Sequence, residues 1–280
     1  MLLLAATESA DMHAYGWCEA AAQSGWPGVW AIGAALVMGA VYFASIAALG
    51  RMKNRPRWGY FTFGLVVWVM TLSGPLERLA LSRSYSGYIL QQIILVMVVC
   101  PALLLGLEDW MLRPLVANRW SRGILQAISR PGLALAVFVC VFTVIHIPWV
   151  CNQLCHVRPF YHTVRLSLFF AGLILWWPLL SPLAEFPRIS QPMQGLYLLA
   201  LMLAMTVVGA PVALADSVLY HFYMGGPHPL GISALQDQVL GGLLMWVVQG
   251  IILTVLAAVI FVRWLSHPEE RGAARVRSVG

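Results

Sequence analysis

The sequence predicts an all-α fold, a polytopic integral membrane bundle of about seven transmembrane helices. The first observation is composition: 60% of the 280 residues are hydrophobic and 10% are charged, whereas about 25% of residues are charged in a soluble domain. The second is a series of apolar stretches, each near the length of about 20 residues that a helix needs to cross a bilayer. Because these stretches are continuous and do not alternate with polar residues, they indicate helices rather than barrel strands.

The apolar stretches place the expected transmembrane helices along the chain. They are expected at 28–50, 58–76, 87–106, 132–150, 164–183, 193–213 and 239–264. In the long loop after the third stretch, the residues LEDWMLRPL predict a short helix at the membrane interface. The sequence shows no internal repeat and no second domain.

The distribution of basic residues predicts the orientation. Most of the 17 basic residues occupy alternate loops or the tail, namely Arg51, Lys53, Arg55, Arg57, Arg113, Arg119, Arg122, Arg130, Arg188, Arg263, Arg271, Arg275 and Arg277. Under the positive-inside rule, these loops face the cytoplasm. We therefore expect a multi-pass protein of a bacterial plasma (inner) membrane. Its parts are an outer N-terminal segment at 1–27, a seven-helix membrane domain at 28–264 and a cytoplasmic tail at 265–280.

The net charge of +6 and the pI near 9.3 do not indicate a nucleic-acid-binding protein. The basic residues flank apolar spans, so we expect them to contact anionic lipid headgroups. The sequence also lacks a G-x-S-x-G motif, a Walker motif, an H-E-x-x-H motif and carboxylates paired at a useful spacing. We therefore expect that the protein is not an enzyme.

One segment at the predicted outer face is rich in soft metal ligands. Residues 146–162 read HIPWVCNQLCHVRPFYH and supply His146, Cys151, Cys155, His156 and His162. Thiolate and imidazole groups suit Cu(I) or Zn, so these residues form a candidate metal site. Two other interpretations of the cysteines remain open. They can form a disulfide, which an outer segment permits, or be unrelated residues near a helix end.

Several segments together resemble the CtaG-like family of membrane proteins that assemble caa-type cytochrome c oxidases. The resemblance rests on PLE at 75–77, SGYILQQIILVMVVCPALLLG at 86–106, HIP at 146–148, PFYHTVRLSLFFAGLILWWPLL at 159–180 and LQDQVLGGLLMW at 235–246. These segments lie in the order of the family, and the resemblance covers most of 58–264. It implies a seven-helix bundle that matures the oxidase, delivers copper to it and has terminal oxidase subunits as partners.

The chain departs from the family pattern at its histidines. The family carries a pattern close to HMLQH, and this chain has Tyr88 and Gln92 at the two histidine positions. On a later helix it keeps His162 but has Leu166 four residues on. The family positions His146, Asp237 and Gln238 are retained. Two histidines four residues apart share a helix face and can hold one metal, so one such pair is lost and the other is halved.

Three functions remain open on the sequence. The first is an oxidase assembly factor that handles copper through His146, His162, Cys151, Cys155 and His156. The second is a metal-free accessory or structural subunit bound to a terminal oxidase complex, because Gln is a weak ligand for Cu(I) and Leu is none. The third is a haem-binding or transport protein, against which few ionisable residues lie within the spans.

Overall fold

The structure, a computed structural model, describes residues 28–49, 55–82, 84–153, 158–224, 228 and 230–266. The expected outer segment at 1–27 and all but the first two residues of the expected tail lie outside the described residues. In the described part every regular element is helical and no strand occurs. The all-α fold class is therefore confirmed.

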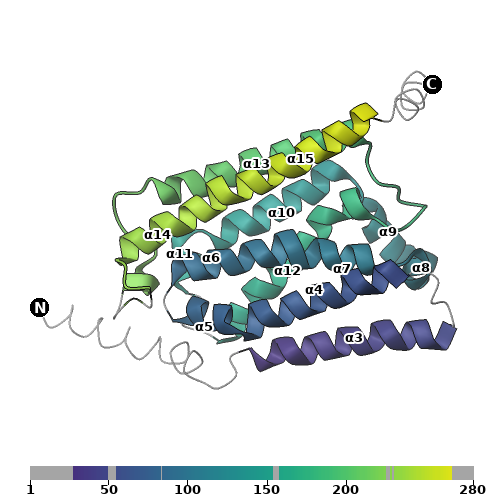
Figure 1. Cartoon of the computed structure of the whole chain (residues 1–280), viewed down its shortest axis with the longest axis horizontal. Coiled ribbons are helices and arrows are strands. Elements are labelled where there is room, and N and C mark those ends of the chain that lie inside the picture. Colours follow the sequence, from purple (N-terminus) through teal and green to yellow (C-terminus); the bar gives the residue numbers. More distant parts are fainter. Residues whose placement is uncertain are drawn as a thin grey trace, which may run out of the picture.

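The helices lie side by side in one bundle (Figure 1). In chain order they are α3 (Val29–Leu49), α4 (Arg55–Ser73), α5 (Pro75–Leu81), α6 (Tyr85–Ile94), η1 (Leu95–Val99), α7 (Cys100–Gly106), α8 (Asp109–Ala117), α9 (Arg119–Ile128), α10 (Pro131–Ile145), α11 (Pro148–Asn152), α12 (Arg158–Leu180), α13 (Gln191–Ala213), η2 (His221–Met224), α14 (Ala234–Leu243), η3 (Leu244–Val248) and α15 (Gln249–Ser266). The segments η1 and η3 are π-helical turns within longer helices, and η2 is a 3₁₀ turn.

Six helices of the described residues are long and apolar enough to cross a membrane. A seventh span results if α9 and α10, which meet at an angle of 83°, are counted as one broken span. The helix α10 has only 15 residues, about 22 Å of helix, which is less than the hydrocarbon thickness of about 30 Å. The chain is thus a multi-pass membrane protein, as its sequence predicts.

The helix boundaries differ from the predicted ones where proline intervenes. The predicted span 58–76 is split because Pro75 has no N–H with which to continue α4, so a new helix starts there. The span expected at 132–150 ends at Ile145 for a similar reason, since Pro148 starts α11. The segment LEDWMLRPL contains a helix, α8, as expected.

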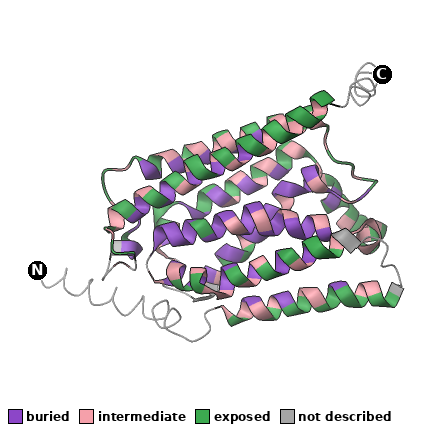
Figure 2. Ribbon diagram, in the orientation of Figure 1, coloured by how far each residue is buried: buried purple, intermediate pink, exposed green. Residues whose placement is uncertain are grey.

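The continuous helix formed by α6, η1 and α7 is the most buried of the bundle (Figure 2). It packs against α4, α12 and α14. The outer helices α3, α13 and α15 instead expose many large apolar side chains, as helices that face lipid do.

The two ends of the bundle differ in chemistry. At one end, which we call the basic end, lie the start of α4, α8, α9 and the loop after α12 (Figure 1), and each of these segments carries arginine. At the opposite end lie α5, the start of α6, α11 and the start of α14 (Figure 1). This opposite end, which we call the polar end, carries most of the candidate site residues.

Candidate functional site

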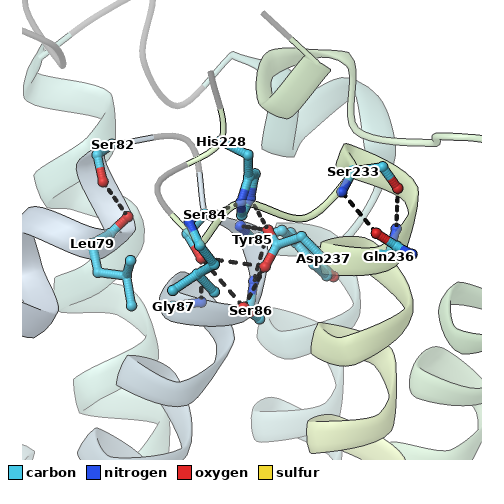
Figure 3. A network of polar contacts seen from close by, with 11 residues as sticks. Leu79, Ser82, Ser84, Tyr85, Ser86, Gly87, His228, Ser233, Gln236 and Asp237 are labelled. Atoms are coloured by element: carbon cyan, nitrogen blue, oxygen red, sulfur yellow. Dashed lines mark hydrogen bonds and ion pairs between the residues drawn. The ribbon is translucent and has the colours of Figure 1, made fainter. Parts of the chain in front are cut away.

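The buried carboxylate of Asp237 joins α14 to the N-terminus of α6 (Figure 3). The backbone N–H and the hydroxyl of Ser86 both donate to it, as does the backbone N–H of Tyr85. Ser84, the N-cap of α6, adds a weaker bond at 3.3 Å between its Oγ and Oδ1. The first N–H groups of a helix lack partners within it and carry partial positive charge, so a carboxylate here is well placed to stabilise α6.

His228 makes one further contact with the carboxylate of Asp237. The Nε2 of His228 lies 3.1 Å from Oδ2 of Asp237, while its Nδ1 accepts the N–H of Leu230 at 3.3 Å. In a neutral His228 ring the proton is therefore on Nε2, but the contact of Nε2 with the carboxylate lacks the geometry of a hydrogen bond. The helix α14 itself starts with a capping box between Ser233 and Gln236 (Figure 3).

The next family position, Gln238, holds the loop that precedes η2. Its Oε1 accepts the N–H of Leu219 at 2.6 Å, and its Nε2 donates to the carbonyl of Ser217 at 3.2 Å. One turn later, Gly241 and Gly242 permit close helix packing. A Cβ at Gly241 would lie 2.4 Å from the ring of Tyr85. Within the segment LQDQVLGGLLMW, Gln238 is therefore accounted for by hydrogen bonding and Gly241 by close packing.

A second buried network surrounds Glu77 of α5. Its Oε2 lies 2.9 Å from Nη1 of Arg165 on α12 and accepts the side-chain amide of Gln91 at 2.5 Å. Its Oε1 accepts the hydroxyl of Tyr161 at 3.0 Å. The Arg165 guanidinium also lies over the rings of Tyr161 and Tyr88, at 4.2 and 5.9 Å from their centroids. The charge pair is thus enclosed by hydrogen bonds and aromatic rings.

The family positions Tyr88 and Gln92 lie on the buried face of α6. They lie near each other, but the Tyr88 hydroxyl and both amide atoms of Gln92 are buried without a hydrogen bond of good geometry to a described residue. Gln92 also borders a small interior cavity together with Phe142 and Gln249. These polar atoms are among the unsatisfied buried groups of the polar end, and Tyr88 and Gln92 are two of the three positions that depart from the family pattern.

The retained His146 is buried at the end of α10. Its Nδ1 donates to the carbonyl of Phe142 at 2.7 Å, while its Nε2 has no partner among the described residues. Burial lowers the pKa of His146 to about 4, although the bond to Phe142 opposes that shift. The ring is therefore neutral at physiological pH, with the Nε2 lone pair available.

The thiol of Cys151, in α11, is enclosed by tyrosines of the polar end. Cys151 is fully buried and free. Burial raises the pKa of its thiol to about 12, with a hydrogen bond to Tyr223 acting weakly against this. The neighbouring ring of Tyr220 stacks on Tyr85 at 4.4 Å, and its hydroxyl donates to the carbonyl of His146 at 3.0 Å. The candidate ligands Cys155 and His156 lie outside the described residues.

The remaining family positions, His162 and Leu166, lie on α12, but not on its buried face. His162 packs edge-on against Trp30 of α3, with ring centroids 5.2 Å apart. Leu166 is exposed. Since Tyr161 and Arg165 occupy the buried face of α12, the positions of His162 and Leu166 point towards the side of the bundle where α3 lies.

The described residues offer a poor fit to a copper ion. They contain no group of three His, Cys, Asp or Glu side chains arranged to hold a metal. At the polar end, the Nε2 of His146 is an imidazole nitrogen without a hydrogen bond to a described residue. The Cys151 thiol has a raised pKa and so resists forming the thiolate that binds metals.

Local sequence patterns did not predict the network around Glu77. Arg165 lies within a long apolar stretch, and its partner is 88 positions earlier in the chain, beyond the reach of any local pattern. The one available signal is the spacing of Tyr161 and Arg165, which places them on the same helix face.

Comparison with known proteins assigns the chain to a family. A family model described as the cytochrome c oxidase caa3 assembly factor matches residues 40–267. No curated protein and no solved structure matches the chain significantly. The matched region includes Glu77, Asp237 and the helices that they join. Because this match covers most of the chain, the protein belongs to the cytochrome c oxidase caa3 assembly factor family.

Proposed function

We propose that this protein assists the assembly of a caa3-type cytochrome c oxidase from within the bacterial plasma membrane, as a non-catalytic scaffold without its own copper site. The N-terminal segment would lie outside and the basic end would face the cytoplasm. The observation that carries the proposal is that retained family residues bind the backbone of the protein itself. Asp237 and Gln238 bind backbone groups of the same chain, which is a structural role.

The loss of copper ligands supports the same conclusion. In this chain Tyr88 and Gln92 occupy the buried face of α6, and neither is a good Cu(I) ligand. His162 packs on Trp30, and Leu166 offers no donor. The scaffold around these positions is nevertheless intact. The bundle would then act through its surfaces on terminal oxidase subunits, which are its proposed partners.

One observation favours a copper-handling alternative. The buried Nε2 of His146 has no partner among the described residues, and an unpaired imidazole nitrogen is a suitable copper ligand. Cys155 and His156 would have to complete the site. Copper content therefore has to be measured together with partner binding.

The first experiment deletes the gene for this protein and measures the haem and copper content of the assembled oxidase. For a scaffold, we expect a loss of assembled oxidase that added copper does not restore. Tagged protein purified in mild detergent should retain oxidase subunits and contain copper well below one equivalent. Rescue of the deletion by copper salts would instead favour copper delivery.

The second experiment restores the lost histidines. The triple variant Tyr88→His, Gln92→His, Leu166→His should bind Cu(I) more tightly than the natural chain when both are reconstituted under reducing conditions. A matched control replaces His146 with Gln in both backgrounds. If the natural chain binds one Cu(I) and His146→Gln abolishes this, the copper-free proposal is wrong.

A further inference from the structure

A cavity of about 380 Å³ lies at the basic end of the bundle. The loop after α12, the first turns of α4 and the end of α7 line this open cavity. Its volume falls within the range of about 300–1,000 Å³ that is typical of small-molecule sites. Its lining combines two arginines with apolar side chains, chiefly Arg57, Arg188, Tyr60, Leu104, Leu105 and Leu180.

Backbone carbonyls hold both arginines at the cavity. The Nη1 of Arg57 donates to the carbonyl of Leu107 at 3.0 Å, and the Nε of Arg188 donates to the carbonyl of Ser181 at 3.3 Å. A guanidinium carries five N–H donors, so each arginine keeps most of its donors for a ligand. These hydrogen bonds restrict the two side chains before a ligand binds, which lowers the entropic cost of ordering them on binding.

The two positive charges of Arg57 and Arg188 lie close together. Burial, and secondly the charge of Arg57, lower the pKa of Arg188. Within the described part of the chain neither arginine forms an ion pair. Two nearby acids are engaged elsewhere: Glu108 accepts the indole N–H of Trp110 at 3.0 Å, and Asp109 pairs with Arg113.

From this geometry we infer that the cavity binds an anionic phospholipid, whose phosphate lies between Arg57 and Arg188. Arginine recognises phosphate through charge-assisted, often bidentate hydrogen bonds. An anion between the guanidiniums would relieve their mutual repulsion. The leucines Leu104, Leu105 and Leu180 form an apolar wall that suits the first part of an acyl chain. A free phosphate ion would use the arginines but leave this wall without a ligand.

The test measures lipid binding to the full-length protein by native mass spectrometry in a neutral detergent. Phosphatidylglycerol should bind in preference to phosphatidylcholine. The double variant Arg57→Gln, Arg188→Gln should lose at least about tenfold in affinity for phosphatidylglycerol, which corresponds to about 1.4 kcal/mol. The matched control Arg113→Gln removes an exposed charge at the same end and should bind as the natural chain does.

Two further measurements keep the inference testable. Because Arg188 lies in the loop after α12, whereas Arg57 lies in a helix and binds the backbone carbonyl of Leu107, the single variant Arg188→Gln should fold and lose affinity several-fold. Inorganic phosphate at millimolar concentration should not displace the lipid. Unchanged phosphatidylglycerol binding in the folded double variant would overturn the site. Displacement by inorganic phosphate alone would overturn the lipid as its occupant.

Discussion

Arg165 lies 2.9 Å from Glu77 through Nη1 and Oε2, and both side chains are almost completely buried, at 6% and 1% exposure. The pair joins α12 to α5, two elements far apart in the sequence. A single charge at this depth is costly in a membrane protein, so each residue needs the other. Hydrogen bonds from Gln91 and Tyr161 complete the arrangement.

Removing one partner of this pair should destabilise the protein strongly. Arg165→Met leaves the Glu77 carboxylate buried without a cation, and we expect the free energy of unfolding to fall by about 3–5 kcal/mol. Unfolding in mild detergent, monitored by circular dichroism, measures the change. The double variant Glu77→Gln, Arg165→Met should lose less than the two single changes together.

The exposed pair of Arg113 and Asp109 provides the control for that experiment. Its two side chains are 69% and 32% exposed, so the solvent screens their attraction. Arg113→Met should lower the free energy of unfolding by no more than about 0.5 kcal/mol. Similar losses for Arg113→Met and Arg165→Met would contradict the structural role of the buried pair.

Gly241 should not tolerate a larger side chain. A Cβ added there would meet the Tyr85 ring at 2.4 Å, and overpacking of this kind costs about 1–3 kcal/mol. Gly241→Ala should therefore lower the thermal midpoint in detergent. Gly195→Ala is the matched control, because no atom lies within 4 Å of its added Cβ and alanine favours a helix. Equal thermal midpoints for the two variants would show that Gly241 is not needed for packing against Tyr85.

Asp237→Asn should loosen the junction between α6 and α14. Asparagine lacks the negative charge that attracts the N–H groups of Tyr85 and Ser86, and its amide group would face these donors. We expect a loss of about 1.5–3 kcal/mol in the free energy of unfolding, the range for hydrogen bonds to charged groups. Backbone amides at the start of α6 should also exchange hydrogen faster. Unaltered exchange there would argue against this role.

The sequence predicted the bundle because apolar length and arginine placement are properties of consecutive residues. The sequence did not predict the ion pair of Arg165, because no local pattern connects Arg165 to Glu77. The family resemblance identified Asp237 and Gln238 but assigned them no role, because their partners are backbone groups of distant segments. The candidate metal ligands lie on one short segment of the sequence. In the structure, however, His146 packs against Phe142 and His162 packs against Trp30.

Cys151 should resist alkylation in the folded protein. Its side chain is buried, and burial raises the pKa of the thiol to about 12, so the reactive thiolate is scarce at neutral pH. A maleimide probe in mild detergent should label it only after unfolding with sodium dodecyl sulfate. Mass spectrometry of the peptide that contains Cys151 gives the labelled fraction. The exposed Cys140 serves as the comparison, with a probe that partitions into the detergent micelle.

The stability of the fold should depend on pH through His146. Burial lowers its pKa to about 4 in the folded protein, whereas an unfolded histidine titrates near 6.5. Below about pH 6.5 the unfolded chain binds a proton that the folded chain excludes, so stability is full above that pH. It should fall towards pH 4 by at most about 1.4 kcal/mol per pH unit. His146→Gln removes this titration, so its unfolding free energy should vary less over the same range. Parallel pH curves for the two proteins would show that His146 is not the group responsible.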